Sequence, residues 1–344
     1  MSQSAPPLAG PGRLGRWRHA LSTINPPSGE LDTVSRWLVI TRAGVLPMTL
    51  TAGAIAGLLA VRSHDFALGW FVLAFLGIVL AHVSNNLVND LFDTDEGLDT
   101  ADYPRALYAP HPILSGMIDR DGLVRAAVIV NAADLVILAI LIGARGVPVL
   151  VFGVAGVVLN VAYTAPPLRL KKRGLGELDV LLVWGPLMIA GTYYSAVGHI
   201  PGEVWLAGIP YGLLCTAVLM GKHIDKLPWD RAEGVRTLPV ILGERDARRV
   251  TEALMIGFYV MVVVCVVTGA LPWPALAAFG ALPLLARALR ALGRPRPERP
   301  PRGFPVWPLW FAAFAFTHTR RAGALLVAGL AVAAILGIGP SWMK

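Results

Sequence analysis

Cysteine and charge are both scarce in this sequence. Only two of its 344 residues are cysteine, which excludes a fold held together by a framework of disulfide bonds. Cys215 and Cys265 both fall inside apolar segments, where a lone thiol usually serves as a small packing residue. Charged residues make up 15% of the chain, hydrophobic residues make up 55%, and the mean hydropathy is +0.61. This composition excludes an ordinary soluble domain and indicates an integral membrane protein.

Apolar segments of about 20 residues, long enough to cross a bilayer, recur along the chain. We predict spans at residues 38–61, 66–91, 121–143, 146–164, 178–197, 203–222, 248–269, 271–290 and 321–339. The predicted fold class is therefore all-α, a polytopic membrane helix bundle of about nine transmembrane helices. Residues 305–318 are compatible with an interfacial or re-entrant helix. Residues 1–36 are polar and basic, which predicts a partly disordered N-terminal extension without a cleavable signal peptide, followed by one membrane domain over 37–344.

Basic side chains outnumber acidic ones by 30 to 22, so the formal net charge is +8. The excess gathers before the first span and in alternate loops, and we assign Arg320 and Arg321 to the loop before the ninth span. With nine spans these segments share one side of the membrane, and the other side keeps little beyond Arg62, Arg145 and Lys344. Cytoplasmic loops are enriched in Lys and Arg, so the N-terminus and these loops are predicted to be cytoplasmic in a multi-pass protein of the cell membrane. Topology accounts for the charge, and no nucleic-acid partner is expected.

Two acidic segments follow spans two and six and therefore face the same compartment. In the first, Asn86, Asp90 and Asp93 follow i, i+4, i+7 spacing, which puts them on one face of a continuing helix. The second contains Asp225 and Asp230. Carboxylates at the mouth of a membrane helix usually hold a cation or a substrate. Because Mg2+ binds a few carboxylates and completes its shell with water and phosphate oxygens, the pattern indicates Mg2+ with a lipid diphosphate whose tail enters the bundle.

Several motifs in the right order resemble the UbiA superfamily of membrane aromatic prenyltransferases. Asn89, Asp93, Gly97 and Asp99 fill the Asn/Asp-rich pattern of its 1,4-dihydroxy-2-naphthoate prenyltransferases, which act in menaquinone synthesis. The other matching segments are 111–118, 163–177, 185–194 and 230–239. The resemblance spans roughly residues 38–340.

This resemblance implies Mg2+-assisted ionisation of a polyprenyl diphosphate and attack of an electron-rich ring on the resulting carbocation. The carboxylates that it implies as metal ligands and catalytic residues are Asp90, Asp93, Asp99, Asp225 and Asp230. The residues that it implies for substrate binding are Asn86, Asn89, Arg105, Tyr163, Lys171, Lys172, Lys222, Arg236, Tyr193 and Tyr194. Of these, the tyrosines would stabilise a cation through their ring faces.

The second acidic motif departs from the family's pattern. Lys226 stands four residues before Asp230, where the family usually has an aspartate, and Asp225 stands five before it. Either Asp225 reaches the metal from a helix end distorted near Pro228, or Asp230 works with fewer partners.

The expected function is transfer of a polyprenyl group to a small aromatic acceptor, with 1,4-dihydroxy-2-naphthoate favoured. Alternative acceptors within the superfamily are a hydroxybenzoate, a tocopherol or chlorophyll precursor, a sugar phosphate and a carotenoid. The alternative outside the superfamily is a cation-coupled secondary transporter. A transporter should carry charges near the bilayer midplane, where the spans 121–143, 178–197 and 248–269 have almost none apart from Asp134. Donor chain length and oligomeric state are left open.

Overall fold

The computed structural model describes residues 12–23, 31–95, 97, 109–304, 306–340 and 342. Every regular element among these residues is helical, which confirms the all-α prediction. The first elements are α1 (Arg13–Thr23), α2 (Thr33–Ile40), η1 (Ala43–Val45), α3 (Pro47–Ala60), α4 (Leu68–Asp95), α6 (Arg120–Arg145) and α7 (Val147–Thr164). Next come η2 (Leu170–Arg173), α8 (Gly176–Leu182), the π-helical η3 (Val183–Leu187), α9 (Met188–Val197), α10 (Gly202–Ala232) and α11 (Leu238–Leu242). The last are α12 (Glu244–Val267), η4 (Trp273–Ala281), α13 (Leu282–Leu292) and α14 (Trp310–Ile335).

Eight helical segments of the described chain are long and apolar enough to cross a membrane. Each coincides with a predicted span, although the first begins at Ala43, because α2 is a separate helix that ends before the turn at Arg42. The ninth predicted span lies in α14, which has 26 residues and starts at Trp310.

The interpretation of the segment before the ninth span is corrected by α14. Residues 310–318 form its first turns, so they are not a separate interfacial or re-entrant helix. Arg320 and Arg321 lie inside α14, where both are exposed, and not in the preceding loop. The helix begins early because Asp225 of α10 accepts hydrogen bonds from the backbone N–H groups of Phe311 and Ala312, which the first turn of a helix leaves without partners.

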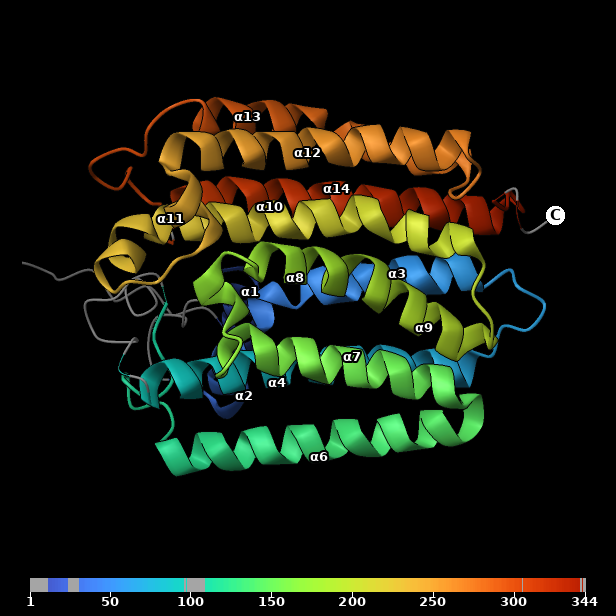
Figure 1. Cartoon of the computed structure of the whole chain (residues 1–344), viewed down its shortest axis with the longest axis horizontal. Coiled ribbons are helices and arrows are strands. Elements are labelled where there is room, and N and C mark those ends of the chain that lie inside the picture. The colour runs from blue at the N-terminus through green and yellow to red at the C-terminus, as the bar shows by residue number, and fades with distance from the viewer. Residues whose placement is uncertain are drawn as a thin grey trace, which may run out of the picture.

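The long helices run side by side along the long axis of the molecule (Figure 1). The helices α2 and α11 and the loop between α7 and α8 lie at one end, which we call the polar end, and the C-terminus lies at the other (Figure 1). Tight reversals join neighbouring helices: Gly146 takes φ 79° between α6 and α7, and Pro148 fits the first turn of α7.

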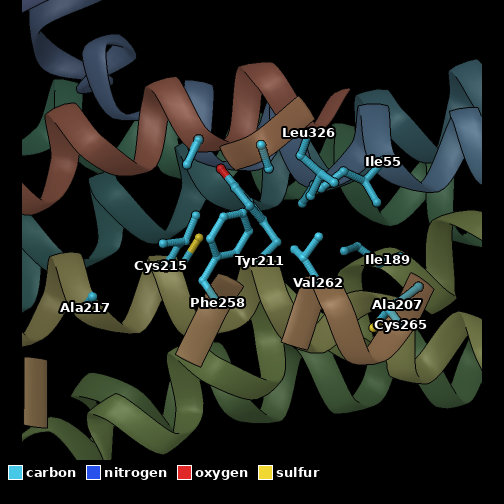
Figure 2. Packing of buried hydrophobic residues seen from close by; sticks show 14 of the residues in the cluster. Ile55, Ile189, Ala207, Tyr211, Cys215, Ala217, Phe258, Val262, Cys265 and Leu326 are labelled. Carbon is cyan, nitrogen blue, oxygen red and sulfur yellow. The ribbon is translucent and has the colours of Figure 1, made fainter. Parts of the chain in front are cut away.

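The largest core cluster surrounds α10, which packs against α12, α14 and the α8–α9 segment. Small residues permit the close approach: a methyl group on Gly221 would lie 2.8 Å from the backbone nitrogen of Ala312. Figure 2 shows Tyr211 and Cys215 of α10 beside Phe258 of α12. Cys215 and Cys265 are both buried and free, in agreement with packing roles. Apolar side chains on α6, α7 and α12 remain exposed, as lipid-facing residues do.

Candidate active site

The polar side chains of the acidic motif on α4 contact two different groups of residues. Asp90 is buried and pairs with Arg42, whose Nε donates to Oδ2 at 3.2 Å, and His111 Nε2 lies 3.6 Å from Oδ1. Asn86 donates to the carbonyl oxygen of Thr41 at 3.1 Å. Asn86 and Asp90 therefore contact the α2–η1 turn, whereas Asp93 contacts Lys171. The expected convergence of all three side chains on one ion is not seen in these contacts.

Asp93 and Asn89 face the loop that joins α7 to α8, residues 165–175. Lys171 Nζ lies 2.7 Å from both carboxylate oxygens of Asp93 and 3.0 Å from Asn89 Oδ1. Thr164 at the end of α7 donates to the same Asn89 oxygen at 3.3 Å. Asp93 and Lys171 are both buried, and a buried ion pair keeps its charges only because each side compensates the other.

Two arginines near the cations of the α4 cluster take a left-handed backbone conformation. Arg42 has φ 52° and precedes η1, and Arg169 has φ 45° and precedes η2, which carries Lys171. A non-glycine residue in this conformation costs about 1 kcal/mol or more, and such strain gathers at functional sites. The fold therefore accepts strain at both points where a cation meets α4.

The α7–α8 loop also reaches the second acidic segment. Gly174 packs against the segment after α10: a methyl group there would lie 2.5 Å from Ile241 Cδ1 and 3.6 Å from the Arg236 carbonyl oxygen. Glu177 lies two residues beyond the loop, and its Oε1 is hydrogen-bonded to His223 Nδ1 of α10 at 2.7 Å. One loop thus joins the α4 cluster to α10 and its extension.

Tyr163, near the end of α7, is influenced by carboxylates of both acidic segments. Its hydroxyl is within electrostatic reach of Glu177, Asp179, Asp93 and Asp230. Its ring packs against Gly176, where a methyl group would come within 3.1 Å of Cε2. Its predicted role beside a substrate cation stays a prediction.

Asp230 and Asp225 of α10 have different surroundings. Asp230 is buried and forms an i, i+4 ion pair with Lys226 at 3.6 Å. Asp225 lies with both oxygens on α14, at 3.1 Å from Phe311 N and 2.9 Å from Ala312 N. The helix continues through Pro228 to Ala232, so the distortion that would turn Asp225 toward Asp230 is absent from α10. These contacts make Asp225 a cap of α14, and they do not support its predicted role as a metal ligand.

Tyr193 and Tyr194 are not brought to the cluster. Tyr194 donates to the carbonyl oxygen of Arg145 at 2.9 Å, and Tyr193 contacts the ring of Trp342 at the end opposite the polar end. Along the α8–α9 segment, Tyr194 lies about 25 Å beyond Glu177 at 1.5 Å per residue. Their predicted contact with a substrate cation therefore finds no support in the structure.

The other predicted binding residues are placed as follows. Lys172 and Lys222 are half-buried on the α7–α8 loop and α10, and Arg236 is exposed beside Gly174. Asp99 and Arg105 lie outside the described residues. Within the described ranges, no three carboxylate, imidazole or thiol side chains come together as a metal-binding group.

Sequence reasoning missed three residues of the site. Arg42, His111 and Glu177 were not among the predicted site residues, although each contacts an acidic or titratable group there. Arg42 carried no local signal, because its partner lies 48 residues away. His111 and Glu177 stood in the segments 111–118 and 163–177, which had been singled out, and only their contacts were unknown.

A cavity of about 240 Å³ begins one helical turn below the α4 cluster. At its upper rim Asn85 donates to Asn160, and these residues precede Asn89 and Thr164 by one turn on α4 and α7. The cavity continues between α4, α6, α7 and the α8–α9 segment, where most of its wall is apolar, as Ile137, Leu138 and Phe152 are. A charged cluster therefore stands directly above an apolar chamber.

The family model described as the UbiA prenyltransferase family matches residues 50–314. The chain belongs to the UbiA prenyltransferase family. It is therefore a prenyltransferase with several membrane-spanning helices. It is 26% identical over 303 residues to the 2-carboxy-1,4-naphthoquinone phytyltransferase of Synechocystis sp., covering 86% of this chain and 88% of that protein. It is 28% identical over 234 residues to the 1,4-dihydroxy-2-naphthoate octaprenyltransferase of Escherichia coli, covering 66% and 75%.

Solved structures of the family share the fold of this chain. A UbiA homologue from Aeropyrum pernix superposes with a TM-score of 0.62 at 17% identity, covering 83% of this chain and 96% of that one. A homologue from Archaeoglobus fulgidus bound to GPP and Mg2+ gives 0.53 at 15% identity, covering 86% and 99%. At these identities the likeness concerns the fold alone.

Proposed function

We propose that this UbiA prenyltransferase transfers a polyprenyl group from a polyprenyl diphosphate to 1,4-dihydroxy-2-naphthoate, in a reaction that depends on Mg2+. The observation that carries the proposal is the buried Asp93–Asn89–Lys171 cluster, which lies one helical turn above an apolar chamber. A lipid diphosphate has the matching shape, a charged head and an apolar tail. The naphthoate compounds named for two relatives support the acceptor.

The donor set fits Mg2+ bound together with a diphosphate. Mg2+ is usually held by one or two carboxylates, with substrate phosphates and water in its other positions, so a group of three protein ligands is not required. Asp93 and Asp230, one from each acidic segment, are two of the four carboxylates that act electrostatically on Tyr163, and they are the two that would hold the metal. When bound, the metal neutralises charge that develops on the leaving diphosphate. Asp90 would support α4 through Arg42, and Asp99 remains a predicted ligand.

The cations of the site would then bind phosphate. Lys171 is placed at Asp93 and Asn89, and Lys226 at Asp230, so each lies where a metal-bound diphosphate would sit. Lys172, Lys222 and Arg236, on the α7–α8 loop, α10 and the segment after it, would add to them, and Arg105 stays a predicted contact. Diphosphate departure leaves an allylic cation, which the ring of Tyr163 would stabilise. The apolar chamber keeps water from that cation.

The pair formed by His223 and Glu177 belongs to the same site. It is buried on the α10 side of Tyr163, and one oxygen of Glu177 and one of Asp179 have no hydrogen-bond partner. Buried polar atoms without partners are costly, and a bound substrate group can satisfy them. We assign this side of the site to the polar groups of the acceptor. The positive charge at the polar end supports a cytoplasmic position for the site and the N-terminus.

Turnover tests the proposal directly. Purified protein in detergent or nanodiscs receives Mg2+, a radiolabelled polyprenyl diphosphate and either 1,4-dihydroxy-2-naphthoate, 4-hydroxybenzoate or a sugar phosphate. We expect a lipid-soluble labelled product with the naphthoate, and its loss on chelation with EDTA and recovery with Mg2+. Product with another acceptor and none with the naphthoate overturns the acceptor assignment, and turnover that survives EDTA overturns the metal.

A further inference from the structure

A second pocket lies away from the active site, between α13 and α14. Figure 1 places α13 at the edge of the bundle, with α6 at the opposite edge. The pocket has a volume of about 470 Å³. Its lining residues are Arg287, Arg290, Ala291, Arg294, Pro295, Pro297, Trp310 and Phe314.

The pocket contains three positive charges and no negative one. Arg287, Arg290 and Arg294 follow i, i+3, i+7 spacing along α13 and just beyond it, so they share one face. No acidic side chain lines the pocket, and in the described part of the chain no ion pair involves these arginines. Like charges at this spacing repel one another, which an anion in the pocket would relieve.

The walls of the pocket are fixed by contacts on its protein side. Arg296 donates to the carbonyl oxygens of Asp225 at 2.8 Å and Pro308 at 3.3 Å, which holds the linker that follows α13. Arg248 donates to the Leu292 carbonyl oxygen at 3.0 Å and so anchors the last turn of α13. The pocket is therefore a built feature of the fold.

An aromatic wall and an apolar surface complete the pocket. The rings of Trp310 and Phe314 lie edge to face at 4.9 Å on α14. Further from the polar end, Leu282 and Leu276 are 42% and 38% exposed on α13 and η4. The arginines thus stand between the polar end and an apolar surface that faces lipid, at the depth where phospholipid headgroups meet acyl chains.

We propose that this pocket binds the phosphate group of an anionic membrane phospholipid, with its acyl chains along the exposed apolar surface of α13 and η4. Guanidinium groups match phosphate oxygens in charge and in hydrogen-bond geometry. Arg287 and Arg290 hold the phosphate, Arg294 closes the pocket from the polar end, and Trp310 packs at the level of the glycerol backbone. The site is separate from the active site and does not depend on the proposed reaction.

The test measures lipid binding to the full-length protein after delipidation in a neutral detergent. Native mass spectrometry and thermal stability are recorded with dioleoyl phosphatidylglycerol, dioleoyl phosphatidylcholine or inorganic phosphate. We expect retention of phosphatidylglycerol and a raised melting temperature, little effect of phosphatidylcholine, and no effect of millimolar phosphate. Equal binding of the two lipids overturns selectivity for anionic lipid, and equal stabilisation by free phosphate overturns the assignment to lipid.

Matched variants locate the binding. The triple substitution Arg287→Gln, Arg290→Gln and Arg294→Gln should weaken phosphatidylglycerol binding by about a hundredfold, since each basic residue near an anionic surface contributes about 1 kcal/mol. The control triple substitution, Arg245→Gln, Arg299→Gln and Arg302→Gln, removes the same charge from exposed positions outside the pocket and should bind as the wild type does. A lysine version of the pocket triple tests for misfolding, because it keeps the charge and should keep most of the binding. Equal loss in the two glutamine triples overturns the proposal.

Discussion

The two acidic segments end long helices at the same end of the bundle, but their carboxylates have different partners. On α4, Asp90 and Asp93 pair with cations that lie 48 and 78 residues away in the chain, Arg42 and Lys171. On α10, Asp230 pairs with Lys226 of its own helix, and Asp225 accepts backbone hydrogen bonds that begin α14. The difference teaches that an aspartate in such a motif can serve either a substrate or the fold, and only its partners tell the two apart.

The largest expected effect separates Asp93 from its neighbour Asp95 on α4. Asp93→Asn should lower kcat by about 10²–10³-fold, because it removes a proposed ligand of the Mg2+ that would neutralise the developing charge of the leaving group. Asp95 lies on the exposed side of the helix end and pairs with Arg120, so Asp95→Asn should keep near wild-type turnover. Both are measured with the radiolabelled diphosphate at saturating Mg2+. Equal loss in the two variants would remove Asp93 from the proposed ligands.

The next prediction contrasts Asp225 with Asp230. Asp225→Asn leaves one of two buried backbone N–H groups without its acceptor, so we expect a loss of about 1–3 kcal/mol of stability and a lower melting temperature. Turnover per folded molecule should change little. Asp230→Asn should show the reverse, with a near-normal melting temperature and a low kcat. If Asp225→Asn lost turnover while its melting temperature stayed normal, Asp225 would be a ligand after all.

A smaller effect is expected at Lys171, the cation of the α4 cluster. Lys171→Met removes the proposed phosphate contact and the ion pair with Asp93, so KM for the diphosphate should rise by about tenfold, the equivalent of about 1.4 kcal/mol. Lys171→Arg keeps the charge and should recover part of the loss. The matched control is Arg173→Met, because Arg173 is exposed on the same loop and donates to Pro167 O. An unchanged KM in Lys171→Met would contradict the assignment.

The smallest effect concerns Asp32, which caps α2 as Asp225 caps α14. The hydrogen bond from Ser35 N, followed by that from Trp17 Nε1, lowers the pKa of Asp32 below its usual value of 3.8. A lowered pKa in the folded state means that the cap stabilises the fold above that usual value and is lost as the pH falls below it. The protection factors of α1 amides, which are exchange rates corrected for the intrinsic pH dependence of exchange, should therefore stay constant from neutral pH down to about pH 5 and fall in stronger acid. Asp32→Asn should show faster exchange of α1 throughout, and a pH response unchanged by this substitution would contradict the prediction.

Sequence patterns were sufficient for the long apolar helices and for part of the site, but not for α1 (Arg13–Thr23), which lies in the extension predicted to be partly disordered. Hydrophobic runs are local signals, and each predicted span corresponds to a helix of the structure. The prediction also named Asp93, Asn89, Lys171 and Tyr163, which the structure brings to one place.

The remaining site residues needed different information. The contact of Arg42 with Asp90 depends on how α2 folds back to α4, which no local pattern encodes. Other errors were avoidable. In a regular helix, five residues turn the side-chain direction by about 140°, so Asp225 and Asp230 cannot face the same ion from α10. Tyr194 stands near the end of a span that begins at the polar end, which already places it far from the site.

The paired charges of the active site have a consequence for the order of binding. Asp93 is already paired with Lys171, and Asp230 with Lys226. Without substrate, the carboxylates are therefore neutralised by lysines of the protein itself. A divalent ion arriving alone would have to displace an ammonium group, and a diphosphate arriving alone would have to displace a carboxylate. When both bind together, Mg2+ takes the place of the lysines at the carboxylates, and the diphosphate takes the place of the carboxylates at the lysines. Each ligand should therefore raise the affinity for the other by the same factor. Calorimetric titration with Mg2+ should then give little heat until the diphosphate is present.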